Sequence, residues 1–135
     1  LGEPLTISHD RLTHVFPTPE RLAAAADGDL PLPRQRAATV RRLAQAVVDG
    51  EVTLDRSADR QMVRDTLARI RGIGPWSIGH IEMRGFGDPD VFLAGDLVAR
   101  RGLDRLELGT GAADRWRPWR SYATRHVWNT VWSPQ

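Results

Sequence analysis

The stretch Arg71–Trp76, with the sequence RGIGPW, decides the fold of this chain. Apolar residues recur at helical spacing up to Ile70, and Gly72 can adopt the positive φ that ends a helix. Pro75 is suited to the first turn of a new helix, because its fixed φ matches that position. The string therefore predicts a tight hairpin between two helices over residues 63–84.

The backbone of this hairpin is predicted to bind an anion. The N–H groups near Gly72 and Gly74, and those of the next helical turn, are expected to point outward beside a positive helix end. Ile73 is expected to pack between the two helices. A DNA phosphate suits such a site, which would position a duplex without reading its sequence. On the two glycines alone, an ordinary helix–turn with no ligand is the favoured explanation, and the whole string with its flanking helices reverses this.

The rest of the chain also has a helical pattern, and no segment shows the sustained alternation of a β-strand. We expect one all-α domain of about six short helices over residues 1–135. The first helix is expected to begin at Pro19, after the N-cap Thr18, and to end at Asp27–Gly28; the second opens at Pro33 and has a left-handed Gly50 at its end. The next three are expected to begin near Ser57, at Pro75, which starts a helix to about Arg84, and at Asp96. The last runs from about Ser121 to Trp132, with one apolar stripe of Ala123, Val127 and Val131.

The composition excludes several kinds of chemistry. All 19 basic residues are Arg, and 17 acidic residues leave a net charge of +2, a weak indication of nucleic-acid binding. GC-rich codon usage is the favoured explanation for the lack of Lys, but whatever the cause, no Lys can form a Schiff base. With no Cys there are no disulfides, thiolate zinc sites or cysteine-held iron–sulfur clusters.

The sequence predicts neither a membrane span nor an export signal. No apolar run approaches 18 residues, and Leu1–Pro4 lacks both an initiator Met and the features of a signal peptide. We expect a protein of the bacterial cytoplasm, associated with the nucleoid. We also expect the chain to be part of a longer polypeptide whose upstream domains are missing.

Four segments resemble a known family. Leu67–Ser77 is similar to the hairpin of the helix-hairpin-helix DNA glycosylase superfamily, and residues 91–101, which include Asp96, resemble its catalytic loop. Phe16–Ala25 and Trp116–Ala123 are similar to DNA-3-methyladenine glycosylase II, the AlkA type. The resemblance implies the C-terminal part of such a glycosylase domain. Its first helices, the region that supplies the DNA wedge residue and the N-terminal β-rich domain have no match here.

The resemblance implies that this protein removes alkylated purines such as 3-methyladenine from double-stranded DNA. Such enzymes flip the nucleotide out of the duplex and hydrolyse its N-glycosidic bond. Asp96 matches the family's aspartate, which would stabilise the positive charge on the sugar and would orient or deprotonate the water. Asp is also a favoured N-cap, and the two roles are compatible. Trp76 stands where bifunctional relatives carry a Lys, so we expect monofunctional hydrolysis without lyase activity.

The substrate-binding residues that the resemblance implies are Trp76, His80 and Trp128. An alkylated purine is cationic and suits an electron-rich aromatic pocket. The family usually has Tyr at the position of His80 and an aromatic residue at that of Leu97, so we expect the substrate range to differ. Core packing is the alternative explanation for so many Trp residues. We expect the remaining three, Trp116, Trp119 and Trp132, to support the core or the surface.

Further contacts are expected around the hairpin. Arg71 and Arg100 are candidates for DNA phosphate contacts, with a role as ordinary solvated residues equally open. The family often holds a sodium ion through backbone carbonyls, which here would belong to Ala68, Ile70 and Ile73. We expect no catalytic metal, no other cofactor and a monomer.

Three other functions compete with this prediction. The hairpin alone would support a non-catalytic helix-hairpin-helix DNA-binding module, but a pure binder has no need of the Asp96 carboxylate near phosphates. The segment His80–Glu82 has the H-x-E form of zinc deaminases, but the paired cysteines are absent. The iron–sulfur glycosylases are disfavoured for the same lack of Cys.

Overall fold

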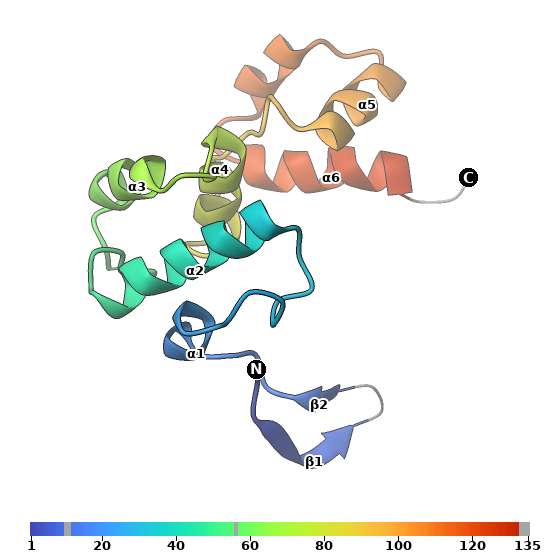
Figure 1. The fold of residues 1–135 in the computed structure, drawn as a ribbon. Coiled ribbons are helices and arrows are strands. Elements are labelled where there is room, and N and C mark those ends of the chain that lie inside the picture. Colours follow the sequence, from blue (N-terminus) through green and yellow to red (C-terminus); the bar gives the residue numbers. More distant parts are fainter. Residues whose placement is uncertain (10–11, 56, 133–135) are drawn as a thin grey trace. The chain divides into compact units, whose positions relative to one another are not determined.

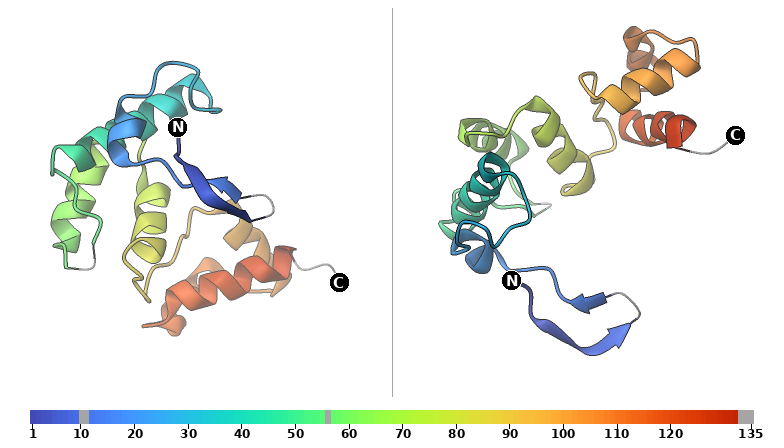
Figure 2. Two further views of the ribbon diagram at one scale, coloured as in Figure 1. Left: turned by 90° about the horizontal axis from the view of Figure 1, so that it is seen from below. Right: turned by 45° about the vertical axis from the view of Figure 1, so that its right-hand side comes forward.

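The computed structural model describes residues 1–9, 12–55 and 57–132, and they are mostly helical (Figures 1 and 2). The chain forms two compact units, one of Leu1–Leu54 with Ala58–Ile73 and one of Asp55–Ser57 with Gly74–Gln135. The elements in chain order are β1 (Pro4–His9), β2 (Leu12–His14), α1 (Pro19–Ala23), α2 (Arg34–Val48), α3 (Arg60–Arg69), α4 (Pro75–Arg84), α5 (Leu97–Arg105), the 3₁₀ helix η1 (Thr110–Trp116) and α6 (Arg120–Trp132).

A small antiparallel sheet near the start of the first unit corrects the prediction of helices throughout. Strand β1 pairs with β2, with Pro4 opposite His14, and Val15 donates its N–H to the Glu3 carbonyl at 2.9 Å. The sequence of Leu5–Ser8 does alternate apolar and polar residues, but over too few positions to stand out. The described side chains of β2 are exposed, so this ribbon contributes little to the core.

Helices α1 and α2 begin at or directly after the predicted residues, but α1 ends at Ala23, before the expected Asp27–Gly28. Thr18 caps α1 through its hydroxyl, which accepts from the Arg21 N–H at 3.4 Å. Helix α1 packs against α2, which follows Pro33, and Gly50 has a φ of 73° after its end, as predicted. Helix α3 begins later than expected, because the Asp59 carboxylate caps it.

The second unit has its core between α4, α5 and α6. Met83, Leu93, Ala99, Leu103, Val127 and Trp128 form one buried cluster. Helix α5 lies close to α6 at Gly102, where any side chain would collide with the Val127 carbonyl. Helix α4 spans the predicted residues, and Asp96 directly precedes α5.

The buried face of α6 differs from the predicted stripe. Only Val127 of the expected apolar residues is buried, together with Ser121, Thr124 and Trp128. The two hydroxyls can be buried because each has a partner: Ser121 donates to the Asp88 carbonyl at 2.6 Å and Thr124 to the Arg120 carbonyl at 2.8 Å. Hydroxyl groups whose hydrogen bonds are satisfied therefore form part of a buried face that was expected to consist of apolar residues.

None of the helices in the described part of the chain is both long and apolar enough to cross a lipid bilayer.

Candidate active site

Asp96 lines a cavity in the second unit. The cavity has a volume of about 310 Å³, which is at the small end of the range of about 300–1,000 Å³ for ligand pockets. Its lining contains the carboxylate and the three predicted substrate-binding residues, Trp76, His80 and Trp128. The fold thus brings together residues from α4, α6 and the start of α5.

The carboxylate of Asp96 accepts three hydrogen bonds. Trp76 donates its indole Nε1–H to Oδ2 at 2.7 Å, and Trp128 donates its own to Oδ1 at 3.0 Å. The backbone N–H of Ala99 donates to Oδ1 at 2.7 Å, which makes Asp96 the N-cap of α5. The same side chain therefore caps α5 and lines the cavity. The positive potential at the start of the helix stabilises its negative charge.

These donors determine the charge state of Asp96. The residue is only 7% exposed, and this burial by itself raises the pKa of the carboxyl. The hydrogen bonds from Trp76, Ala99 and Trp128 outweigh burial and hold the pKa of Asp96 below its ordinary value. Asp96 is thus an ionised, preorganised carboxylate at neutral pH, and a weak base.

The imidazole of His80 lies between the two indoles. Its ring centroid is 4.1 Å from that of Trp76 and 5.4 Å from that of Trp128, with interplanar angles of 32° and 25°. Its Nδ1 atom is buried and has no hydrogen-bond partner among the described residues. The aromatic wall of the cavity therefore contains one unpaired polar atom.

Three further residues line the cavity that sequence reasoning did not place there: Arg84, Val98 and Trp132. Trp132 was assigned to core or surface support, yet it is 62% exposed and its ring lies 5.8 Å from that of Trp128. Its position four residues after Trp128, one turn along the helix, is the signal that could have found it. Leu97, by contrast, is 65% exposed and is not among the lining residues.

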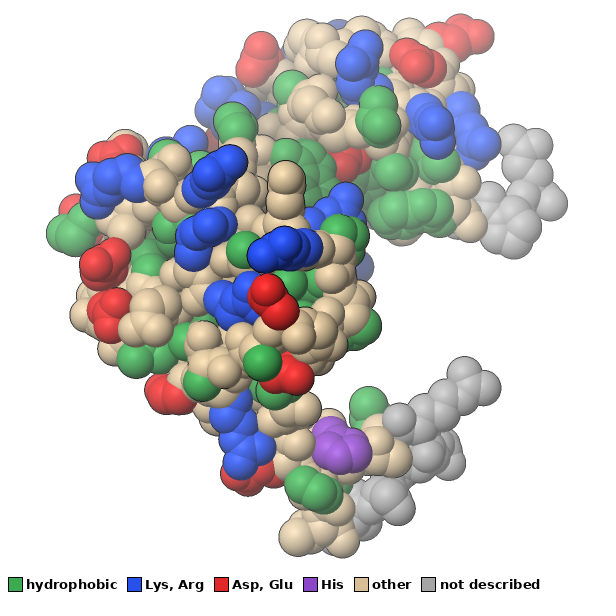
Figure 3. Space-filling view, viewed as in Figure 1, with side chains coloured by type: hydrophobic (Ala, Val, Ile, Leu, Met, Phe, Trp, Pro, Cys, Tyr) green, Lys and Arg blue, Asp and Glu red, His purple; other side chains and the backbone are tan. Residues whose placement is uncertain are grey.

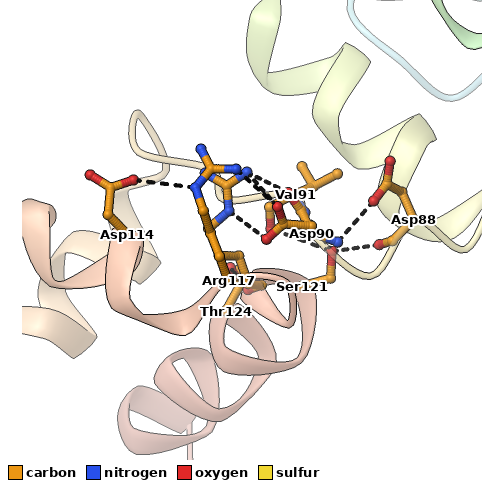
Figure 4. A network of polar contacts seen from close by, with 8 residues as sticks. Asp88, Asp90, Val91, Asp114, Arg117, Ser121 and Thr124 are labelled. Atoms are coloured by element: carbon orange, nitrogen blue, oxygen red, sulfur yellow. Dashed lines mark hydrogen bonds and ion pairs between the residues drawn. The ribbon is translucent and has the colours of Figure 1, made fainter.

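A polar network holds the segment before Asp96 against the start of α6 (Figure 4). Arg120 makes two hydrogen bonds to the Asp90 carboxylate, at 2.7 and 3.0 Å, and Arg117 adds a third at 3.0 Å. Ser121 accepts from the Val91 N–H at 3.0 Å. Arg120 and Ser121 are on the same helix as Trp128. The network therefore holds the loop that carries Asp96 in place relative to Trp128, one of the two indole donors to its carboxylate.

The predicted DNA-binding residues lie partly in each unit. Gly72 and Ile73 end the first unit, and Gly72 has the positive φ, 99°, that its sequence position predicted. Gly74 begins the second unit as the N-cap of α4, without a side-chain hydrogen bond. Arg71 and Arg100 are both exposed.

The predicted sodium ligands lie around the end of α3. The Ile70 carbonyl accepts from the Ile73 N–H at 3.0 Å, so one of the three oxygens already has a partner. Carbonyl oxygens at a helix C-terminus are the kind of ligand that a hard cation binds. A sodium ion bound at this place stays a prediction. No group of three or more His, Asp or Glu side chains within the described ranges is placed to hold a metal.

A helical domain with one N-capping aspartate in an aromatic cavity is the arrangement expected for a helix-hairpin-helix glycosylase. The chain is 41% identical to the probable bifunctional transcriptional activator/DNA repair enzyme AlkA of Mycobacterium tuberculosis, over 99% of this chain and 29% of that protein. It is 37% identical to DNA-3-methyladenine glycosylase 2 of Escherichia coli, over 88% of this chain and 44% of that protein. The chain thus spans less than half the length of these relatives.

The fold is also found in a solved structure. The crystal structure of a DNA-3-methyladenine glycosidase from Bacillus halodurans matches with a TM-score of 0.66 and 23% identity, over 87% of this chain and 61% of that one. No model of a known protein family matches the chain. From the sequence relatives, the chain is similar to a portion of the AlkA-type DNA-3-methyladenine glycosylases.

Proposed function

We propose that this chain is the base-excising part of a DNA glycosylase that hydrolyses the N-glycosidic bond of alkylated purines such as 3-methyladenine. The observation that carries the proposal is the Asp96 carboxylate, held by two indole N–H groups at the edge of an aromatic cavity. A non-catalytic DNA-binding module would not need a buried carboxylate in such a cavity. The proposal puts the protein in the bacterial cytoplasm, on nucleoid DNA.

The cavity suits a flipped, cationic base. The faces of Trp76 and Trp128 supply π-electron density, and a cation–π contact contributes about 0.5–2 kcal/mol. A positively charged base is already a good leaving group, so the enzyme needs to supply less stabilisation. His80 in place of the family's usual Tyr makes the wall less electron-rich and is expected to alter the choice of base.

In the reaction, the C1′–N bond breaks and its electron pair leaves with the base, which departs neutral. Positive charge develops on the sugar, and the oxygen of a water molecule then bonds to C1′ and releases a proton. The lowered pKa of Asp96 favours electrostatic stabilisation of the sugar cation over proton abstraction, because a carboxylate with three donors is a poor base. No Lys is present, so no Schiff base forms and the product is an abasic site.

The hairpin is proposed to hold the DNA. The N–H groups around Gly72 and Gly74 would bind a backbone phosphate, with Ile73 between them, and Arg71 and Arg100 would add charge. The carbonyls of Ala68, Ile70 and Ile73 would hold a structural cation there.

The test is single-turnover release of 3-methyladenine from methylated duplex DNA, with DNA affinity measured in parallel. We expect Asp96→Asn to retain binding and to lose at least about 100-fold in rate, the usual cost of removing an electrostatic stabiliser. Asp104→Asn, a change at the other end of α5, is the matched control. If the wild-type chain binds DNA and releases no base, it is a binding module and the proposal is wrong.

A further inference from the structure

A concave basic surface lies in the first unit, outside the aromatic cavity. The hollow has a volume of about 520 Å³, and three of its lining residues are Arg34, Arg42 and Arg71. Among the described residues, no Asp or Glu lines it. Figure 3 shows arginine side chains spread over the face of this unit that carries α2.

The surface is built from α2 and from the residues that follow α3. Thr39 on α2 has its hydroxyl 3.2 Å from the Arg71 carbonyl and 3.0 Å from that of Gln35. Gly72 lies so close to the Thr39 side chain that any Cβ there would collide with it. The backbone at Arg71 is therefore held beside α2 by close packing.

Two arginines of α2, Arg34 and Arg42, line the hollow together. Arg34 and Arg42 are eight residues apart, which is about 12 Å along the helix axis, enough to reach more than one phosphate of a DNA strand. Arg36 lies on a different part of the helix and does not line the hollow. Two of the four arginines of α2 thus lie on the side that adjoins Arg71, while Arg41 pairs with Asp27.

These arginines are available to an outside partner. Arg34 is paired only loosely with Asp27, at 3.8 Å, and its side chain is 88% exposed. Arg42 and Arg71 are exposed and form no ion pair within the described residues. An exposed ion pair contributes little, so exchanging Asp27 for a phosphate costs little.

A neighbouring hollow on the same unit provides a contrast. Arg42 and Arg71 also line this second surface, of about 410 Å³, but there they are accompanied by Asp49 and Glu51. Its mixed charge makes it a poor surface for DNA. The side of Arg42 and Arg71 that faces Arg34 is the one suited to a polyanion.

We propose that the surface formed by Arg34, Arg42 and Arg71 is a second contact for the DNA backbone, beside the hairpin and distinct from the base cavity. The inference rests on the proposed function. The partner is duplex DNA, bound through successive phosphates without sequence preference. The surface extends the footprint of the protein along the duplex and contributes affinity that is lost at high salt.

The experiment measures the affinity of the 135-residue chain for an undamaged 20-base-pair duplex as a function of salt. For Arg34→Gln/Arg42→Gln, we expect the slope of log K against log salt to fall by about 1.8, or about 0.9 for each lost phosphate contact. Arg36→Gln is the matched control on the same helix and is expected to leave the slope unchanged. Circular dichroism checks that each variant keeps its helices.

The outcomes separate this inference from the proposed function. If the double variant has the wild-type slope, or loses no more than Arg36→Gln, the surface is not a DNA contact and the inference is wrong. If the variant binds heparin more weakly but the duplex equally well, the surface takes another polyanion, and the inference is also wrong. A fall in slope together with no base release by the wild-type chain would support the surface and refute the glycosylase activity.

Discussion

Trp76 and Asp96, 20 residues apart in the chain, are joined by a 2.7 Å hydrogen bond from the indole Nε1 to Oδ2. Trp76 is thus a donor that stabilises the negative charge of the carboxylate. The tryptophan was expected to contact the base through its ring face. Its N–H gives it a second role, in controlling the charge and orientation of Asp96.

Replacing Trp76 by Phe removes this donor and keeps an aromatic ring. A hydrogen bond to a charged group is worth about 1.5–3 kcal/mol, so we expect base release at neutral pH to slow by about 10-fold or more. Because the donor lowers the pKa of Asp96, its loss raises that pKa, and the acid limb of the pH–rate profile moves to higher pH. Single-turnover rates from about one pH unit below the ordinary pKa of 3.8 up to neutral pH measure both effects. Trp119→Phe, an exposed site outside the cavity, is the control, and an unmoved acid limb would show that the indole does not control Asp96.

His80→Tyr is expected to shift substrate preference. The imidazole lies between two indoles and leaves Nδ1 without a partner in the described structure. A phenol has a more electron-rich face and favours a cationic base by up to about 1 kcal/mol, about fivefold. Competing release of 3-methyladenine and neutral hypoxanthine from duplex DNA gives the ratio. An unchanged ratio would mean that this side chain does not contact the base.

The network at Asp90 predicts a loss of stability in acid. The hydrogen bonds from Arg120 hold the pKa of Asp90 below its ordinary value of 3.8. A depressed pKa contributes stability above the unfolded value, and this contribution disappears as the pH falls through the folded value. We therefore expect Asp90→Asn to destabilise the protein at pH 7 and to make little difference well below pH 3.8.

Urea unfolding followed by tryptophan fluorescence suits this measurement, since all five Trp residues belong to the second unit. Asp114→Asn is the control, because that carboxylate is 76% exposed and lies 3.8 Å from Arg117. Equal destabilisation by Asp90→Asn at pH 7 and in strong acid would show that charge is not the cause.

Gly102→Ala tests the close contact between α5 and α6. Its methyl group would collide with the Val127 carbonyl, and overpacking of this kind costs about 1–3 kcal/mol. Gly109→Ala has open space around it and is expected to change the free energy of unfolding by less than about 0.5 kcal/mol. Thermal unfolding of both variants gives the comparison. If Gly102→Ala leaves the free energy of unfolding unchanged, α5 and α6 can move apart at this contact without a loss of stability.

The absence of Lys predicts that no covalent complex with DNA forms during the reaction. Borohydride added to the protein and methylated duplex is expected to trap no adduct, and the product should carry intact abasic sites until heated in alkali. A bifunctional glycosylase serves as the positive control. A trapped species with this chain would contradict monofunctional hydrolysis.

Local sequence signals predicted most of the helices. Thr18, Pro33, Gly50 and Pro75 lie where their backbone preferences placed them, because caps and fixed φ angles act within a few residues. The ribbon of β1 and β2 was missed, since its alternating pattern is short. The start of α3 was placed too early, because several polar residues near it can cap a helix and Asp59 is the one that does.

The residues of the site were identified from the sequence through resemblance, but their contacts were not. Nothing near Asp96 in the chain indicates that Trp76 and Trp128, 20 and 32 residues away, donate to its two oxygens. That Trp132 lines the cavity was also missed, because no residue near Asp96 in the chain indicates it.

The sequence by itself therefore determined the helical class, the hairpin glycines, the N-capping position of Asp96 and the absence of Lys and Cys chemistry. Each of these follows from residue identity or from interactions within one helical turn. Only the tertiary structure decided which donors surround the carboxylate, which face of α6 is buried and where the arginines of α2 meet Arg71. These depend on packing between segments far apart in the chain, which local conformational preferences do not specify.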